Sequence, residues 1–263
     1  MLQEFFSSPR PLVFAHRGGS GLAPENTLAA FDQGLALGAD GLELDVHLSK
    51  DGVVVVHHDR TLARTTNLDG EVAERTAAAL AAADAGYRYQ RADGLFPFRG
   101  LGVGVPALAD VLARYPHVPI IIELKVNTGE LARAVVDVVR AAGAAARVCL
   151  GSFGLGVLRA ARRLEPAIAT SASREETRWA LYRSWVHWPA RRSEYGGFQV
   201  PEWSGATRVV SPRFIDAAHR ARLGVQVWTV DTELDAERLL AWGADALITD
   251  RPDIIVPVCK RPR

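Results

Sequence analysis

Two carboxylates stand two positions apart in a stretch that otherwise has the alternating apolar pattern of a β-strand. The stretch is GLELDVHLSKDGVVVVHHD (41–59), and its acids are Glu43 and Asp45. Side chains two positions apart on a strand point the same way, so these carboxylates converge on one spot. Burying them without a partner would be costly, which indicates that something positive faces them.

A third carboxylate, Glu123, lies near the end of a separate apolar segment, 119–125. If the ends of these segments meet, three carboxylates form a hard oxygen site suited to Mg²⁺ or Ca²⁺. The alternative is a structural ion-pair network in which the acids pair with Arg17 and Lys125. That network is the simpler explanation of any single acid, but three acids with two histidines nearby favour the metal site.

Histidines end two further apolar segments. His16 follows LVFA and precedes Arg17, while His57 and His58 close the run VVVVHH. Two imidazoles that flank one substrate can serve as general acid and general base, and an arginine can bind phosphate through two hydrogen bonds. His57 and His58 point in opposite directions on a strand, so one of them is expected to face the site, and the pattern alone does not select it. The alternative for a lone histidine is ordinary solvation or hydrogen bonding.

The elements that must position these residues alternate regularly along the chain. Short apolar segments and amphipathic ones follow one another, as in repeated βα units around a parallel sheet. Asn26 is the expected N-cap of the first helix, which ends at Gly38. The expected barrel strands lie within 12–16, 41–48, 119–125, 147–152, 166–172, 197–201, 224–230 and 245–250, with an accessory hairpin strand within 53–58.

The regular spacing and the acids at strand ends predict a closed TIM-type (β/α)8 barrel. A doubly wound open sheet is the competing α/β architecture. In a barrel, the carboxyl ends of the strands form the mouth at which active sites lie. Glu43, Asp45, Glu123 and His16 would therefore meet there.

The 263 residues suit one large domain, and we expect a single barrel domain over 1–263. Residues from about 61 to 106 form an Ala-rich insertion, longer than an ordinary connection and expected to be a lid or small subdomain after the second strand. The segment 179–198, WALYRSWVHWPARRSEYGGF, mixes tryptophan and tyrosine with arginine. The simpler interpretation is a helix that covers the barrel. The alternative is an aromatic, basic rim that docks a lipid-like or sugar-like group.

Composition excludes some classes of partner. Lys and Arg total 31 against 30 for Asp and Glu, so no overall field attracts nucleic acid or an anionic membrane. Two cysteines far apart in the sequence predict no disulfide framework and favour a reducing compartment. The N-terminal residues lack the pattern of a signal peptide, and no apolar segment is long enough to span a bilayer. We therefore expect a soluble, cytoplasmic protein.

Several separated motifs closely resemble those of the glycerophosphodiester phosphodiesterases, in the family's order and over nearly the whole chain. They are HRGGSGLAPENTLAAF, GADGLELDVHLSKDGVVVVHHD, IIIELK, VWTVD and GADALITDRPD. The resemblance implies a TIM-type barrel. It also implies one divalent cation, Mg²⁺ or Ca²⁺, held by Glu43, Asp45 and Glu123.

The same resemblance implies roles for five more residues. The family's second catalytic histidine directly precedes Asp, which selects His58 to pair with His16. Arg17 and Lys125 would contact the phosphate, and Trp228 in VWTVD would pack near the glycerol. The implied reaction is hydrolysis of a glycerophosphodiester to sn-glycerol 3-phosphate and an alcohol.

In that reaction we assign His16 as the base and His58 as the acid, with water or the substrate's adjacent hydroxyl as the attacking group. One alternative is an enzyme of the lysophospholipase D or sphingomyelinase D type, to which the Trp-rich segment gives some weight. Another is a non-catalytic barrel that binds phosphodiesters, but no ligand or histidine that the chemistry needs is missing. The expected partner is a small-molecule substrate, with transient contact with a membrane surface left open.

Overall fold

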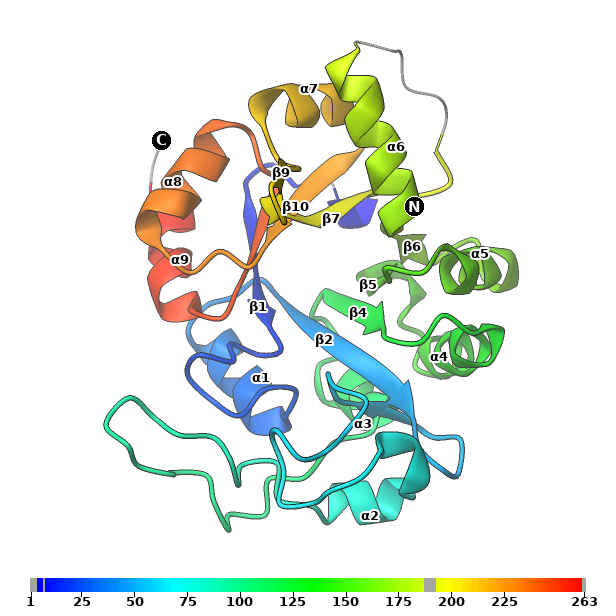
Figure 1. Ribbon diagram of the computed structural model, residues 1–263, viewed down its shortest axis with the longest axis vertical. Coiled ribbons are helices and arrows are strands. Elements are labelled where there is room, and N and C mark those ends of the chain that lie inside the picture. Colours follow the sequence, from blue (N-terminus) through cyan, green and yellow to red (C-terminus); the bar gives the residue numbers. More distant parts are fainter. Residues whose placement is uncertain (1–3, 7, 187–192, 262–263) are drawn as a thin grey trace.

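Eight parallel strands form a nearly closed barrel in the computed structural model, which describes residues 4–6, 8–186 and 193–261 (Figure 1). Strands that follow one another in the chain lie next to one another in the barrel, and the last pairs with the first. The predicted (β/α)8 barrel is therefore confirmed. The barrel strands are β1 (Leu12–His16), β2 (Gly41–Leu48), β4 (Ile120–Leu124), β5 (Val148–Gly151), β6 (Ala169–Thr170), β7 (Gly197–Pro201), β10 (Gly224–Trp228) and β11 (Ala246–Thr249).

The barrel closes between its two least regular neighbours, β6 and β7. A parallel bridge joins Ser171 to Gly197, and the Ala172 amide donates to the Gly197 carbonyl at 2.9 Å. Gly197 has no room for a side chain, because an added Cβ would lie 2.4 Å from the ring of Phe6. Phe6 belongs to the short helix η1 (Glu4–Phe6), whose aromatic rings fill the barrel interior with Phe14 and its neighbours.

The helices that follow the strands surround the barrel (Figure 1). Each turns an apolar face inward, as α4 does with Val135, Val136 and Val139. Among the described residues, no helix is both long and apolar enough to cross a bilayer. The helices are α1 (Leu28–Ala36), α3 (Leu108–Arg114), α4 (Gly129–Ala141), α5 (Leu155–Leu164), α6 (Arg174–Trp185), α7 (Pro212–Arg220), α8 (Glu233–Ala241) and α9 (Pro252–Lys260).

The N-cap of α1 is Thr27, so the prediction of Asn26 is wrong by one residue. The Thr27 hydroxyl accepts a hydrogen bond from the Ala30 amide at 3.2 Å. Asn26 instead adopts a positive φ of 59° and binds Asp45 through its side chain. Thr27 therefore caps the helix, whereas the adjacent Asn26 contacts the site.

The accessory strand β3 (Val54–Val56) pairs with β2 in antiparallel register, which confirms the predicted hairpin. The insertion that follows carries η2 (Val72–Glu74) and α2 (Ala77–Ala81) and lies beside the barrel near α1 and α3 (Figure 1). It buries a small apolar cluster of its own, formed by Val55, Leu62, Val72, Leu80, Ala85 and Val105. The expectation of a lid stays a prediction.

The Trp-rich segment is divided by the structure. Its first part is the outer half of α6, which packs on the barrel through Leu181 and Ser184, as the simpler interpretation predicted. Its members Trp188, Arg191 and Arg192 lie outside the described residues. A short hairpin of β8 (Trp203–Ser204) and β9 (Thr207–Arg208) then projects between β7 and α7.

Candidate active site

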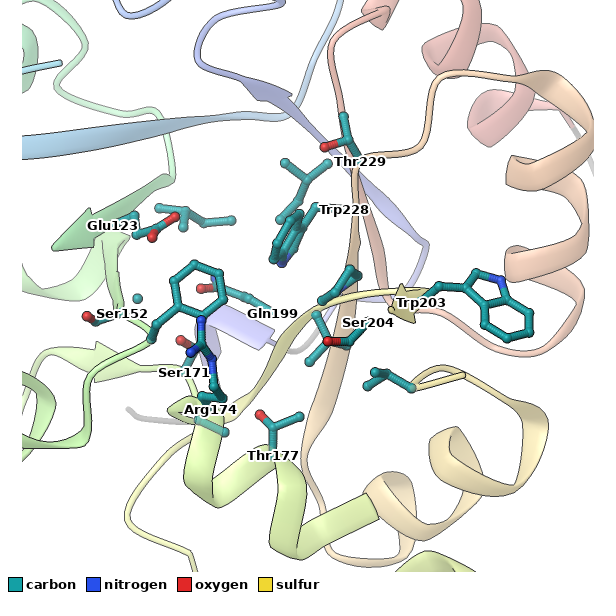
Figure 2. Close-up of a pocket in the computed structure, with 18 of the residues that line it drawn as sticks. Glu123, Ser152, Ser171, Arg174, Thr177, Gln199, Trp203, Ser204, Trp228 and Thr229 are labelled. Atoms are coloured by element: carbon teal, nitrogen blue, oxygen red, sulfur yellow. The ribbon is translucent and has the colours of Figure 1, made fainter. Parts of the chain in front are cut away.

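A cavity of about 670 Å³ opens at the carboxyl ends of the barrel strands (Figure 2). The sequence-predicted site residues line it, apart from Asp45, which is buried directly beside Glu43 and Glu123. The predicted residues in the wall are His16, Arg17, Glu43, His58, Glu123, Lys125 and Trp228. Residues that lie more than 200 positions apart in the sequence are thus brought to one place by closure of the barrel.

The three acids meet because β2 and β4 are neighbours. Asp45 and Glu123 are register partners on the two strands, and Glu43 lies two positions before Asp45 on the same side. One carboxylate oxygen from each of the three lies within 4.8 Å of the others. The convergence inferred from the sequence is therefore present.

Two cations contact this acidic cluster. Lys125 Nζ lies 3.3 Å from both Asp45 Oδ1 and Glu123 Oε1, and Arg17 Nε lies 3.3 Å from Asp45 Oδ2. The Arg17 amide also donates to Glu43 Oε2 at 3.1 Å. The ion pairs of the alternative network are thus present as well, made by the same carboxylates that would hold a cation.

The pKa values of Glu43 and Asp45 shift in opposite directions. Burial raises the pKa of Glu43, and the nearby charge of Asp45 raises it further. Burial would also raise the pKa of Asp45, but the charges of Lys125 and Arg17 lower it instead. A compact cluster of carboxylate oxygens has the donor chemistry to hold a hard divalent cation.

His16 is held in the cavity wall by a carboxylate at the end of the last strand. Its Nδ1 lies 2.7 Å from Asp250 Oδ1, which also accepts a hydrogen bond from the Ser20 hydroxyl at 2.5 Å. Its Nε2 lies 3.8 Å from Glu43 Oε2. Burial would lower the pKa of His16, but the charge of Glu43 and the hydrogen bond to Asp250 raise it. With Nδ1 donating to Asp250, Nε2 is the nitrogen available to a ligand.

His58 has the same kind of support. Its Nδ1 lies 2.6 Å from Asp59 Oδ1, and Asp59 Oδ2 binds Arg64 Nε. Arg64 also donates to Glu25 Oε2 at 2.8 Å, and Glu25 in turn pairs with Arg17 at 3.1 Å. A continuous chain of charged contacts therefore connects His58 with the arginine beside His16.

His57 points away from the cavity. Its side chain is buried, and its Nε2 lies 3.2 Å from the carbonyl oxygen of Thr61. It does not line the cavity, whereas His58 does. Geometry thus separates two histidines that the strand pattern left equivalent.

Five polar residues of the site were not singled out from the sequence: Glu25, Asn26, Asp59, Arg64 and Asp250. Asn26 Nδ2 donates to Asp45 Oδ2 at 2.9 Å, and the Asp45 amide donates back to Asn26 Oδ1 at 3.2 Å. Asp250 ends an apolar strand, as Glu123 does, and Asp59 directly follows a predicted histidine. These positions could have identified Asp250 and Asp59 from the sequence as site residues. No feature of the sequence around Arg64 would have identified it.

Trp228 and Glu123 face the same central space (Figure 2). The Trp228 ring meets the ring of Phe153 edge to face, with centroids 6.1 Å apart. The indole therefore gives the acidic end of the cavity an apolar wall, against which the carbon skeleton of a small polyol could pack.

The sequence profile of the glycerophosphoryl diester phosphodiesterase family matches residues 16–254. The chain belongs to this family. The matched region begins at His16 and extends beyond Asp250, so it contains every site residue described above.

Individual relatives agree with this membership. A glycerophosphodiester phosphodiesterase of Bacillus altitudinis is 32% identical over 255 residues, covering 94% of this chain and 97% of that protein. A phosphodiesterase structure from Oleispira antarctica, in complex with the product sn-glycerol 3-phosphate, superposes with a TM-score of 0.76 at 27% identity. It covers 96% of this chain and 98% of its own. A glycerophosphoryl diester phosphodiesterase domain from Mycobacterium tuberculosis superposes with a TM-score of 0.81 at 25% identity, covering 95% and 98%.

Proposed function

We propose that this protein hydrolyses glycerophosphodiesters to sn-glycerol 3-phosphate and an alcohol. The observation that carries the proposal is one cavity wall holding two histidines, each fixed by a carboxylate, together with a three-carboxylate cluster. Membership in the glycerophosphoryl diester phosphodiesterase family and the product bound to the Oleispira antarctica relative support the same reaction.

Glu43, Asp45 and Glu123 would hold the divalent cation, and the hard oxygen donors favour Mg²⁺ or Ca²⁺. The crowding of the three carboxylates fits this occupant, because their mutual repulsion would become attraction to the ion. When bound, such an ion withdraws electron density from a phosphoryl oxygen and helps to orient the substrate.

Arg17 and Lys125 would bind the phosphate. Both already face the acidic cluster from the cavity wall, and among the described groups Arg17 Nε is buried without a hydrogen bond, although it forms an ion pair with Asp45. An anionic oxygen that enters the cavity would give this N–H an acceptor. Trp228 would pack against the glycerol carbons.

The two histidines would transfer the protons. A cation held by the acidic cluster would offset the charge of Glu43 that raises the pKa of His16, so that His16 can take a proton from the attacking oxygen. That oxygen belongs either to water or to the hydroxyl of the glycerol next to the phosphate. A new P–O bond forms, the P–O bond to the alcohol breaks, and His58 donates a proton to the departing oxygen. Attack by water gives sn-glycerol 3-phosphate directly, whereas attack by the hydroxyl gives a cyclic phosphate, in which water then replaces the ring oxygen. Asp250 and Asp59 act as positioning residues, because each fixes Nδ1 and leaves Nε2 for the reaction.

Replacement of either histidine tests these assignments. His16→Ala and His58→Ala should each lower turnover of glycerophosphocholine by about 10² to 10⁴-fold, because general acid and base catalysis contribute on that scale. His117→Ala is the matched control, since His117 is exposed at the start of the loop before β4. Near-normal turnover in either site variant, with the circular dichroism of the parent, would refute its role.

The lysophospholipase D or sphingomyelinase D alternative is not favoured. The glycerophosphodiester phosphodiesterase of Bacillus altitudinis aligns over almost the whole chain. A side-by-side assay with glycerophosphocholine and a lysophospholipid, with Mg²⁺ and then Ca²⁺, separates the two reactions.

A further inference from the structure

The cavity continues beyond the acids and histidines to a second end formed by α6 and the β8–β9 hairpin. Figure 2 shows Thr177 and Ser204 across the central space from Glu123. Its volume of about 670 Å³ exceeds what a glycerol phosphate fills. The second end is therefore available to the alcohol part of a diester substrate.

Two arginines of α6 line this second end. Arg174 and Arg178 lie one helical turn apart and so share a face of the helix. Among the described residues, no carboxylate lies within 4.0 Å of either guanidinium. Arg162 and Arg238, by contrast, each form a close ion pair with a glutamate. Arg174 instead lies over the ring of Phe153, 4.7 Å from its centroid.

The acids nearby do not neutralise these charges. Glu176 of the same helix binds Arg162 at 2.7 Å, and Glu175 does not line the cavity. The carboxylates among the described lining residues are Glu43 and Glu123, both in the proposed cation site. One end of the cavity is thus acidic and suited to a cation, while the other carries two arginines that pair with no carboxylate among the residues that the structure describes.

A quaternary ammonium group is bound by cages of exposed aromatic ring faces. Two rings at this end are already beside a cation: the guanidinium of Arg174 lies over Phe153, and that of Arg208 lies 5.2 Å from the Trp203 centroid. Tyr182 and Trp185 also line this end, but Tyr182 lies one helical turn from Arg178 on the same face of α6. A choline-like head group would therefore meet an arginine beside these rings.

We propose that Arg174 and Arg178 select diesters whose alcohol carries a second anionic group, and that they disfavour cationic alcohols. The inference rests on the proposed glycerophosphodiester hydrolysis and adds the class of the leaving alcohol. Guanidinium groups bind phosphate and carboxylate oxygens through paired N–H donors, so either anion is suitable.

The test compares kcat/KM for four substrates that differ in the alcohol: glycerophosphoglycerol, its terminal phosphate ester, glycerophosphoglycerate and glycerophosphocholine. The wild type should prefer the phosphate or the carboxylate substrate over the choline substrate by about tenfold or more, the scale of one hydrogen bond to a charged group. The two anionic substrates show whether phosphate or carboxylate is preferred.

Variants that change the charge of α6 test whether Arg174 and Arg178 cause the preference for anionic substrates. Arg174→Gln combined with Arg178→Gln should lower the ratio of anionic to neutral kcat/KM by about tenfold, and the corresponding double Glu variant should favour glycerophosphocholine. Arg133→Gln with Arg159→Gln is the matched control. It removes the same charge from exposed positions on α4 and α5 and should leave the ratio of the wild type.

The outcomes separate the two proposals. If the wild type cleaves none of the four substrates, the proposed function fails. If it cleaves them without an anionic preference, or if the α6 double Gln variant keeps the wild-type ratio, the hydrolysis stands and the role of Arg174 and Arg178 is overturned.

Discussion

Each proposed catalytic histidine depends on a carboxylate that fixes one ring nitrogen. Asp250 holds Nδ1 of His16 at 2.7 Å, and Asp59 holds Nδ1 of His58 at 2.6 Å. A carboxylate in this position selects the tautomer that presents Nε2 to the substrate and also stabilises the protonated ring. The proposed proton transfer therefore also depends on two acids, Asp250 and Asp59, that lie outside the acidic cluster.

Asp250→Asn tests this dependence. The amide preserves the shape but removes the charge that orients His16, so kcat should fall by about 100-fold while KM changes little. The pH profile of kcat should shift as well, which a purely structural role would not cause. Asp216→Asn, an exposed position on α7, is the control, and an unchanged kcat and profile in Asp250→Asn would contradict the account.

The strand pattern and the resemblance together identified residues that line the cavity or lie directly behind its wall. Glu43, Asp45 and Glu123 could be predicted because acids interrupt apolar strands at their ends. Asn26 and Arg64 could not, because each matters through contacts made across loops. Asn26 was instead interpreted as a helix cap, since the residue type suits both roles and only the backbone geometry separates them.

The turn after β1 places His16 and Arg17 in the site, and its backbone has positive φ angles. Arg17 has a φ of 52° and Gly18 a φ of 88°, in the region that favours glycine. A Cβ on Gly18 would lie 2.7 Å from Ala30, so the turn also packs directly on α1. Close packing of the turn thus sets the direction of the side chains before it.

Gly18→Ala should therefore lower the free energy of unfolding by about 3 kcal/mol, since it combines an unfavourable φ with a clash against backbone. Gly52→Ala isolates the first effect. Gly52 has a φ of 77° but nothing within 4 Å of the added Cβ, so its cost should be about 1 kcal/mol. Equal urea denaturation midpoints for the two variants would show that the contact with α1 contributes nothing.

The insertion after β3 contributes a charge to the site. Arg64 binds both Glu25 and Asp59, and those two acids contact Arg17 and His58. Burial would raise the pKa of Glu25, but the hydrogen bonds from Arg64 and the charge of Arg17 hold it below its usual value. Through Arg64, the insertion thus contacts acids that hold residues on both sides of the cavity.

A group whose pKa is lowered by folding stabilises the protein above its unfolded pKa, and this contribution is lost as the pH falls through the folded value. Arg64→Gln should therefore reduce stability at pH 7, and its effect should shrink as the pH falls from about 4 through the lowered pKa values of Glu25 and Asp59. Urea midpoints at pH 7 and at a series of pH values below 4 measure this. Arg60→Gln, which breaks an exposed pair with Glu71, is the control, and an Arg64→Gln effect independent of pH would contradict the coupling.

For the whole molecule, the order of the elements was predictable because each βα unit carries a local apolar pattern and the units repeat. Right-handed βα connections then determine the neighbours of every strand. Barrel closure was inferred from spacing, and β6, reduced to Ala169–Thr170, meets β7 through a single bridge. The insertion had no periodic pattern to interpret, since its contacts are made by irregular chain around a small cluster of its own.

We propose that this barrel mouth hydrolyses a glycerophosphodiester with a divalent cation at Glu43, Asp45 and Glu123. The most direct measurement is ³¹P NMR of glycerophosphoglycerol incubated with metal-stripped protein, before and after addition of Mg²⁺ or Ca²⁺. We expect the diester resonance to be replaced by that of sn-glycerol 3-phosphate only after an ion is added. Full conversion by stripped protein, or no conversion with either ion, would contradict it.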